Sequence, residues 1–403
     1  MKKILLTAVL LQGLAPLARG AEAGEAGKPL FPVALDVKFP RAKQSFEEVK
    51  ELILKNYYSP EIDEETLYWA AIAGMLRRIS PPDYPDLGTL WTKEQYQKIL
   101  DALKGQEVSL GVEGQFTSED GSLSVTGVLP GSSADGSLFA LDRILRFDGK
   151  SLKGRTLEDA KAAMDGVEGS TVTLTVNRDL QILDVTLKRT KFRDANLLVT
   201  PLAPDVALVE IKRFSAGISG ELKKELAKLE ADQVKSIVLD LRNDPGGVFA
   251  EGVRLCELFV PEKGVLLHTY TRGGKLQNYL SSNPRPFRFQ VAILANRSTM
   301  SASELVAGTL RDAGAAFIVG SRTRGKGVFE TTYPLKNEFK VKFITGAMFT
   351  PAGYAWQGKG IMPDFFIDQD EKTVVALARL PVKERVSKDA AILTALKLLG
   401  RKR

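Results

Sequence analysis

The sequence contains only one cysteine and one histidine among its 403 residues, and this excludes several kinds of site. Cys256 cannot form an internal disulfide, and its apolar surroundings are typical of a free cysteine buried in a core. His268 lies in an apolar, β-branched run typical of a strand, and a histidine-based metal site needs more than one such ligand. No feature singles it out as the base of a Ser-His-Asp triad. If the chain is a hydrolase, we therefore expect a general base other than histidine.

A strong excess of charge is also missing. The net charge is +7, and Lys and Arg are scattered, with the densest run at Arg401, Lys402 and Arg403. Apolar residues make up 44% and charged residues 26% of the chain, which is ordinary for a soluble globular protein. We therefore expect no nucleic-acid groove. Because single cores seldom exceed about 250–300 residues, two or three domains are expected.

Long apolar runs are absent except near the start. Two lysines precede a largely apolar stretch from Ile4 to Leu17, and small residues follow at 18–23. This is the layout of a secretory signal peptide, and the stretch is too short to span a bilayer comfortably. We expect residues 1–23 to be cleaved off, and the mature protein to be soluble, outside the cytoplasm and without a further membrane segment. A bacterial periplasm is the expected location.

The hydrophobic period changes along the rest of the chain and divides it. Apolar residues at helical spacing predict an N-terminal helical domain, with its linker, over 24–106. Over 107–192 the period falls to two, which predicts a compact β-rich module. Residues 193–370 alternate apolar strands and helices, which is typical of an α/β core. A basic C-terminal tail, 371–403, carries a predicted helix at Lys388–Leu399.

Three segments combine glycine, a reactive side chain and a strand-to-helix junction, and the first is Asp240–Gly247. It ends a buried strand with Asn-Asp-Pro-Gly-Gly. Gly246 and Gly247 allow positive φ and a close approach of the backbone to a ligand. Free N–H groups in such a turn can stabilise an oxyanion, although a plain tight turn is the commoner meaning of this pattern.

The second segment is Ser301-Ala-Ser-Glu304. It forms a capping box in front of an apolar helix, and the local pattern alone favours simple capping. A serine at a helix start is also where a nucleophile gains most, because the helix dipole favours developing negative charge and the N–H of Ala302 points at it. Ser298 and Ser303 stay open as alternatives.

The third segment is Gly325-Lys326-Gly327. Lysine normally titrates near ~10.4, but burial can lower the pKa of a lysine by several units. A desolvated lysine beside a serine is a recognised nucleophile–base pair. An exposed turn lysine is the commoner case.

Taken together and in this order, the segments resemble the peptidase core of the C-terminal processing (tail-specific) proteases, peptidase family S41. That family carries Asp-Leu-Arg-Asn-x-Pro-Gly-Gly, matched by Asp240–Gly247. It then carries Ser-Ala-Ser-Glu, whose first serine is the nucleophile, and Gly-Lys-Gly, whose lysine is the base; Ser301–Glu304 and Lys326 match these. A further signature is similar to Phe349–Gly353 followed by Gln357–Asp364.

The resemblance implies a multidomain α/β protein: a crotonase-like α/β peptidase core with a PDZ-like β-rich module and an N-terminal helical domain. It implies a serine endopeptidase in which Ser301 attacks the scissile carbonyl and Lys326 accepts its proton. The oxyanion would be held by the N–H groups of Ala302 and of Gly246 or Gly247. The resemblance implies no metal or cofactor, and polypeptide substrates recognised by their C-terminal tails. It leaves an adaptor protein and a homo-oligomer open as partners.

The module at 107–192 resembles the PDZ domain that this family places before its core. Such domains bind a peptide C-terminus as an added strand, with loop amides receiving the carboxylate. The segment Leu110-Gly111-Val112 matches the carboxylate loop in position, so the resemblance implies peptide binding by Leu110, Gly111 and Val112. Leu141 stands where the family has a glycine, so the loop geometry is expected to differ.

One departure from the family lies at the active site. The family usually reads Gly-Lys-Gly-x-x-Gln, and here Glu330 takes the glutamine position. A carboxylate close to Lys326 favours the charged ammonium and opposes its function as a base. We expect Glu330 to slow the enzyme at neutral pH, or to make it dependent on a partner that rearranges the site.

Two other functions stay open. A PDZ-bearing scaffold on an inactive peptidase fold would keep the same motifs; Glu330 and the altered loop favour it, whereas retention of Ser301 and Lys326 argues against it. An acyl-CoA enzyme of the related crotonase-like fold would explain neither the signal peptide nor the PDZ-like module.

Overall fold

A computed structural model describes residues 41–401, with gaps at 60, 83, 85–86, 105, 118, 129–131, 140, 165, 194–195, 369–372, 374–376, 378–379 and 381. The expected signal peptide, residues 1–23, lies outside the described residues and stays a prediction. The chain divides into two compact units, Met1–Arg78 and Ile79–Arg403.

In the first unit, the described residues form two helices, α1 (Ala42–Asn56) and α2 (Glu64–Arg78). Lys50 is buried, donates to the Tyr68 hydroxyl at 2.7 Å and pairs with Glu64, which joins the two helices. Helix α2 begins with acidic and ends with basic residues, an order that the helix dipole favours.

The second unit begins with residues that the sequence pattern assigned to the helical domain. Strand β1 (Thr89–Trp91) pairs antiparallel with β17 (Lys340–Phe349), and helix α3 (Lys93–Leu103) follows it. The N–H of Ala216 donates to the carbonyl of Leu103 at 2.8 Å, so α3 ends against the α/β core.

The β-rich module is a five-stranded antiparallel sheet with one helix, α4 (Leu157–Met164). Its strands, in spatial order, are β3 (Val112–Thr117), β4 (Ser122–Val128), β5 (Arg143–Phe147), β6 (Thr171–Arg178) and β7 (Gln181–Lys188). Strands β2 (Gln106–Ser109) and β8 (Thr190–Arg193) pair at its base. Buried apolar side chains that alternate along β6, together with Ile144 and Phe147 of β5, contribute to its core.

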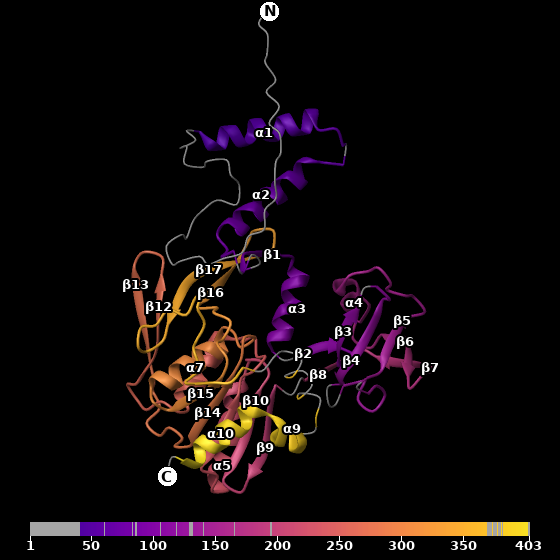
Figure 1. Cartoon of the computed structure of the whole chain (residues 1–403). Helices are drawn as coiled ribbons and strands as arrows, with labels where there is room; N and C mark the ends of the chain where they lie inside the picture. Colours follow the sequence, from indigo (N-terminus) through magenta and orange to yellow (C-terminus); the bar gives the residue numbers. More distant parts are fainter. Residues whose placement is uncertain are drawn as a thin grey trace, which may run out of the picture. The chain divides into compact units, whose positions relative to one another are not determined.

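The α/β core is built on a six-stranded sheet (Figure 1). Its strands, in spatial order, are β18 (Phe365–Phe366), β15 (Ala316–Gly320), β14 (Gln290–Ala295), β11 (Ser236–Asp240), β10 (Val206–Ile211) and β9 (Leu197–Ala203). All neighbours are parallel except β9 and β10. The predicted continuous apolar runs are the central strands, as expected for a parallel sheet covered on both faces.

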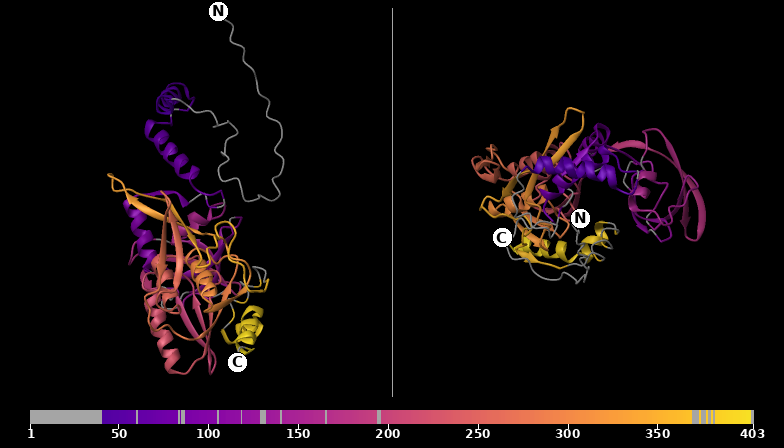
Figure 2. Two further views of the ribbon diagram at one scale, coloured as in Figure 1. Left: turned by 90° about the vertical axis from the view of Figure 1, so that its left-hand side faces the viewer. Right: turned by 90° about the horizontal axis from the view of Figure 1, so that it is seen from above.

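Helices cover the two faces of this sheet, with α5 (Ile218–Ala231), α6 (Phe249–Glu257) and α7 (Ala302–Asp312) on one and α10 (Ala390–Arg401) on the other (Figure 2). Ile237 and Leu239 of β11 pack in the cluster that contains residues of α5–α7, whereas Val238 packs in the cluster of α10. The helix predicted at Lys388–Leu399 is α10, and it is preceded by α9 (Val382–Lys388). The C-terminal segment is therefore part of the core's packing.

A second sheet lies over the α6–α7 side of the core. It contains β12 (Val265–Thr271), β13 (Lys275–Leu280), β16 (Val328–Pro334) and β17, with β16 and β12 both paired to β17. Lys326 lies just before β16, and Glu330 lies on β16. The expected multidomain α/β architecture is confirmed.

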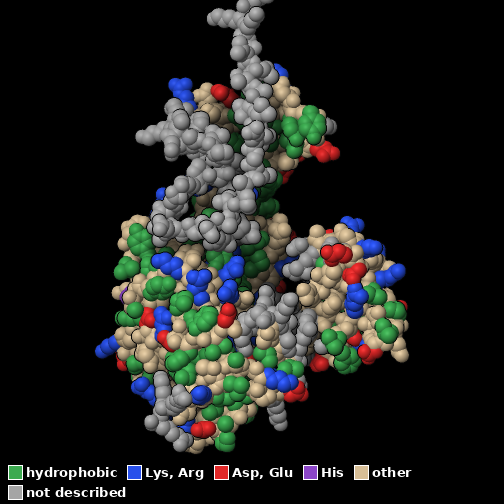
Figure 3. Space-filling model, viewed as in Figure 1, with side chains coloured by type: hydrophobic (Ala, Val, Ile, Leu, Met, Phe, Trp, Pro, Cys, Tyr) green, Lys and Arg blue, Asp and Glu red, His purple; other side chains and the backbone are tan. Residues whose placement is uncertain are grey.

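Two features of the described residues bear on function: the length and apolar character of the helices, and the distribution of basic side chains on the surface. Among the described helices, none combines the length and the apolar character needed to cross a membrane. On the face seen in Figure 3, the Lys and Arg side chains of the described residues are interspersed with other types and form no single continuous basic surface.

Candidate active site

Ser301 immediately precedes helix α7 and has an unusual backbone, with φ 60° and ψ −116°. A non-glycine residue in such a conformation costs on the order of 1–3 kcal/mol and persists only where its surroundings impose it. The side chain is half-buried, and the next residue, Ala302, begins the helix. The hydroxyl therefore lies at a helix N-terminus, where the dipole favours negative charge.

Glu304 connects the two segments that carry Ser301 and Lys326. Its carboxylate accepts the N–H of Ser301 at 2.9 Å, of Gly325 at 2.7 Å and of Lys326 at 2.8 Å. The side chain is fully buried; burial raises the pKa of Glu304, and the hydrogen bonds it accepts oppose that rise. The sequence indicated Glu304 only as a helix cap, so its contact with the lysine segment had no sequence signal.

The backbone around Lys326 is held by the signature at 357–364 and by the tryptophan before it. The Trp356 indole N–H donates to the Lys326 carbonyl at 3.0 Å. The N–H of Gly327 donates to Gln357 at 2.8 Å, and that of Gly358 to the Gly325 carbonyl at 2.7 Å. The signature at 357–364 therefore helps to fix the backbone of the segment that carries Lys326.

The side chain of Lys326 is paired with Glu330. Its Nζ lies 2.9 Å from Glu330 Oε1, and the two side chains are only 14% and 13% exposed. In the part of the chain that the structure describes, no hydrogen bond joins Lys326 to the Ser301 hydroxyl. Lys326 is thus held beside Glu330, the carboxylate that was expected to oppose its function as a base.

The Pro-Gly-Gly turn packs directly against Ser301. A Cβ at Gly246 would lie 2.9 Å from the Cβ of Ser301, and a Cβ at Gly247 would lie 2.3 Å from the Phe214 carbonyl oxygen. The φ angles of these glycines are 84° and 149°, so both positions require glycine. The N–H of Gly246 donates to Asp244 at 2.8 Å. Among the described contacts, the N–H groups of Gly247 and Ala302 have no acceptor.

Asp244 supports this turn from inside. It is fully buried, and burial raises its pKa to about 8. Its carbonyl accepts the N–H of Met300 at 3.0 Å and the hydroxyl of Ser303 at 3.3 Å. Ser303 is therefore buried and hydrogen-bonded, whereas Ser298 is exposed.

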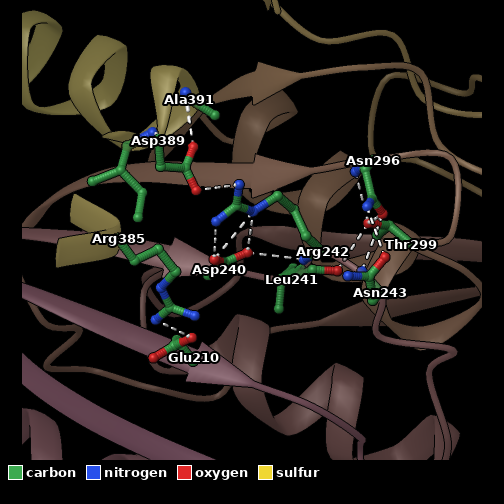
Figure 4. Close-up of polar contacts among 11 residues, drawn as sticks. Glu210, Asp240, Leu241, Arg242, Asn243, Asn296, Thr299, Arg385, Asp389 and Ala391 are labelled. Atoms are coloured by element: carbon green, nitrogen blue, oxygen red, sulfur yellow. Dashed lines mark hydrogen bonds and ion pairs between the residues drawn. The ribbon is translucent and has the colours of Figure 1, made fainter. Parts of the chain in front are cut away.

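A polar network at the end of β11 ties the turn to the segment before Ser301 (Figure 4). The N–H of Asn243 donates to Asn296 at 3.0 Å, and the Asn296 amide donates back to Asn243 at 2.8 Å. The Thr299 hydroxyl donates to the Leu241 carbonyl at 2.8 Å. These bonds hold Asn243 at φ 60°.

The same strand end is joined to the C-terminal helices by buried charges (Figure 4). Arg242 pairs with Asp240 at 2.6 Å and with Asp389, just before α10, at 2.7 Å. Arg385 of α9 pairs with Glu210 of β10 at 2.7 Å. The sequence did not point to these pairs.

The only cysteine and histidine take no part in this arrangement. Cys256 is fully buried, which raises its pKa to about 12. The His268 ring contacts Asn278 at 2.7 Å and the Pro351 carbonyl at 3.2 Å. No group of three His, Cys, Asp or Glu side chains suited to a metal ion occurs among the described residues.

The expected carboxylate loop of the β-rich module precedes the edge strand β3. Leu110 is buried, and its carbonyl accepts the N–H of Ala134 at 3.1 Å. Gly111 has φ 76° and donates its N–H to the Ser109 hydroxyl at 2.9 Å, and Val112 begins β3. Among the described strands of this sheet, β3 is at the edge and pairs only with β4.

The sequence matches two family models. Residues 205–367 match peptidase family S41, and residues 99–177 match the PDZ domain. A protein of Staphylococcus aureus (strain COL) named "probable CtpA-like serine protease" is 34% identical over 326 residues, which are 80% of this chain and 64% of that protein. A protein of the same name from Staphylococcus saprophyticus is 31% identical over 80% of this chain and 65% of its own length. The chain thus spans a little under two-thirds of these relatives.

Two solved structures share the fold. The photosystem II D1 C-terminal processing protease has a TM-score of 0.51 at 23% identity, covering 85% of this chain and 93% of its own. A Bacteroides fragilis chain assigned to the S41 proteases has a TM-score of 0.58 at 16% identity, covering 88% and 97%.

Proposed function

The chain belongs to peptidase family S41 and carries a PDZ domain, and from this premise we propose that it is a serine endopeptidase with a Ser301–Lys326 pair. Ser301 would attack the scissile carbonyl, and a neutral Lys326 would accept the proton of its hydroxyl. The N–H groups of Ala302 and Gly247 would then hold the oxyanion, since the N–H of Gly246 is already engaged by Asp244.

The observation that carries this proposal is the position of Glu304. One buried carboxylate accepts the backbone N–H groups of both Ser301 and Lys326, at 2.9 and 2.8 Å. The nucleophile and the base, separated in sequence, are therefore held on one rigid support. A glutamate that only caps a helix needs to accept only the N–H of Ser301. A catalytic pair also needs the contact with Lys326, because the two segments must be held at a fixed distance.

We propose that substrates are recognised through their C-terminal tails by the PDZ domain. Its strand β3 is an edge strand, and helix α4 lies next to β3. Addition of a peptide strand between them is the binding mode of PDZ domains. We also propose that the protein is exported, because the pattern at residues 1–23 is that of a cleavable signal peptide.

A scaffold function on an inactive peptidase fold is the second candidate. The observation that favours it is the 2.9 Å ion pair between Lys326 and Glu330, because a neighbouring carboxylate in general favours the charged form of a lysine, which cannot accept a proton. Such a protein would bind peptide tails without cutting them.

The test is cleavage of β-casein, an unfolded substrate, by wild type, Ser301→Ala, Lys326→Ala and the matched control Ser298→Ala. We expect the first two variants to lose at least about 1,000-fold in kcat, because nucleophile and base act as a unit. Ser298→Ala should cut like wild type. Equal cleavage by Ser301→Ala would refute the proposed nucleophile.

A second arm separates the peptidase from the scaffold. A peptide with a free C-terminal carboxylate and its C-terminal amide are compared in binding and in cleavage. Tail recognition predicts weaker binding and slower cleavage of the amide. Binding without cleavage at any pH would establish the scaffold.

A further inference from the structure

Glu330 lies near a second lysine on the neighbouring strand. In the β16–β17 pair, Glu330 is opposite Ile344 and Thr332 is opposite Lys342. Side chains alternate along a strand, so Glu330 and Lys342 are diagonal neighbours on one face, a separation that long side chains span. Lys326 approaches the same carboxylate from the segment before β16, at 2.9 Å. Lys326 is thus ion-paired with Glu330, and Lys342 is its diagonal neighbour on the adjacent strand.

The charges of these three groups act on one another. Lys342 is half-buried, and its ammonium lies 5.1 Å from the centre of the Trp91 ring, which belongs to β1. Burial lowers the pKa of Lys342; Glu330 raises it, and Lys326 lowers it further.

Other charged groups of the surrounding elements lie elsewhere along the sheet. Lys340 is two residues from Lys342 on β17, and Lys93 pairs with Glu338 in the β16–β17 connection at 2.7 Å. On β12, His268 and Tyr270 are opposite the far end of β17. Strand β1 contributes no ionisable side chain.

The net charge of the trio Lys326, Glu330 and Lys342 affects whether Lys326 can act as the base. With both lysines protonated and Glu330 ionised, the trio carries one net positive charge. Repulsion between the lysines favours loss of one proton, as for lysines placed beside another cationic group. If Lys326 releases that proton to water, Lys342 still compensates Glu330 and the trio is neutral.

We propose that Lys342 is a positioning residue of this active site: it compensates the charge of Glu330 when Lys326 is neutral, and so leaves Lys326 able to accept the Ser301 proton. In the attack step the proton passes from the Ser301 hydroxyl to Lys326, and the serine oxygen bonds to the scissile carbonyl carbon while the C=O π electrons move onto the carbonyl oxygen, which becomes the oxyanion. Lys342 and Glu330 keep their charges throughout. The inference rests on the proposed function.

This arrangement accounts for the presence of a glutamate at position 330, where the family usually has a glutamine. A neutral glutamine would need no charged partner, whereas an ionised Glu330 would otherwise keep its pairing with Lys326 and oppose proton loss. A second cation on the adjacent strand offsets this effect. The enzyme would then work near neutral pH without a partner protein.

The test is the pH dependence of kcat/KM for β-casein cleavage by Lys342→Met, Lys342→Arg, Glu330→Gln and the double variant Glu330→Gln/Lys342→Met. Lys340→Met is the matched control, since it removes the same charge from the same strand. We expect Lys342→Met to move the acid limb to higher pH by about one unit, which is a roughly tenfold loss of rate at pH 7. Lys342→Arg and Lys340→Met should follow wild type.

The double variant separates charge compensation from a structural effect. It should recover to within about threefold of Glu330→Gln, because without the carboxylate no compensation is needed. Lys342→Gln replaces Lys342→Met if the latter does not fold. If the pH profile of Lys342→Met, or of Lys342→Gln in its place, superimposes on that of wild type, this inference alone is overturned. It is also overturned if Lys342→Arg shows the same shift of the acid limb as Lys342→Met. Undiminished cleavage by Ser301→Ala and Lys326→Ala would instead overturn the proposed function.

Discussion

Gly246 and Ser301 are in such close contact that a Cβ at position 246 would lie 2.9 Å from the Cβ of the serine. The turn that ends β11 and the residue that begins α7 therefore form one surface, although they lie on different segments of the chain. The glycine also has φ 84°, which other residues rarely adopt. A side chain at 246 must displace the backbone that carries the proposed oxyanion donors, the N–H groups of Gly247 and Ala302.

We predict that Gly246→Ala lowers kcat by about 100-fold or more, because loss of one oxyanion donor has an effect of this size. The measurement is β-casein cleavage at saturating substrate. The control is Gly314→Ala, which has φ 69° and no atom near the added Cβ, and should lose about 1–2 kcal/mol of stability with kcat unchanged. Equal kcat values for wild type and Gly246→Ala would contradict the placement of the oxyanion hole.

Asp244 predicts how stability depends on pH. Its pKa is about 8 when folded, through burial, and about 3.9 when unfolded, so the native state binds the proton more tightly. The contribution of this group is therefore greatest below about pH 4 and is lost as pH rises toward 8, by up to about 5 kcal/mol. Asp244→Asn should remove this loss, and urea unfolding at pH 5 and pH 9 measures it. An unfolding free energy that falls equally in both proteins would contradict this prediction.

Asp142 supplies a control of opposite sign. Although burial raises it, the pKa of Asp142 is lowered overall by its hydrogen bonds, those from Arg178 above all. Its contribution is thus present above the unfolded value of about 3.9 and is lost as pH falls through the folded pKa. Asp142→Asn should destabilise at pH 7, where Asp244→Asn stabilises.

Asp389 has two functions that two substitutions can separate. It pairs with Arg242 at 2.7 Å, and it accepts the N–H of Ala391 at 3.0 Å as the cap of α10. Asp389→Asn keeps the cap but loses the charge, and we expect a loss of about 2–3 kcal/mol, because Arg242 retains Asp240. Asp389→Ala should lose about 1 kcal/mol more. Thermal and urea unfolding measure both, and identical values would show that the cap contributes nothing.

The sequence alone was sufficient to predict the local secondary structure of the α/β core. The apolar strands expected within 193–370 include β10, β11 and β14, because a run buried on both faces carries its own signal. The capping box fixed the start of α7 at Ser301. In the β-rich module, Leu141 was expected to alter the loop, and it has a positive φ of 79°, a conformation that favours glycine. Its N–H donates to the Val125 carbonyl at 2.9 Å, a contact that residue type alone does not reveal.

By itself, the sequence predicted the candidate residues: Ser301 at a helix start, with Ser298 and Ser303 open as alternatives, one lysine between glycines, and a glycine pair after a buried strand. Only the tertiary structure decided how they meet. It brought Gly246 against Ser301, joined the segments of Ser301 and Lys326 through Glu304, and made Lys342 the diagonal neighbour of Glu330 through the register of β16 and β17. The physical reason is that periodicity and capping are set by neighbours within a few residues. Contacts between distant segments depend instead on how strands pair and helices pack.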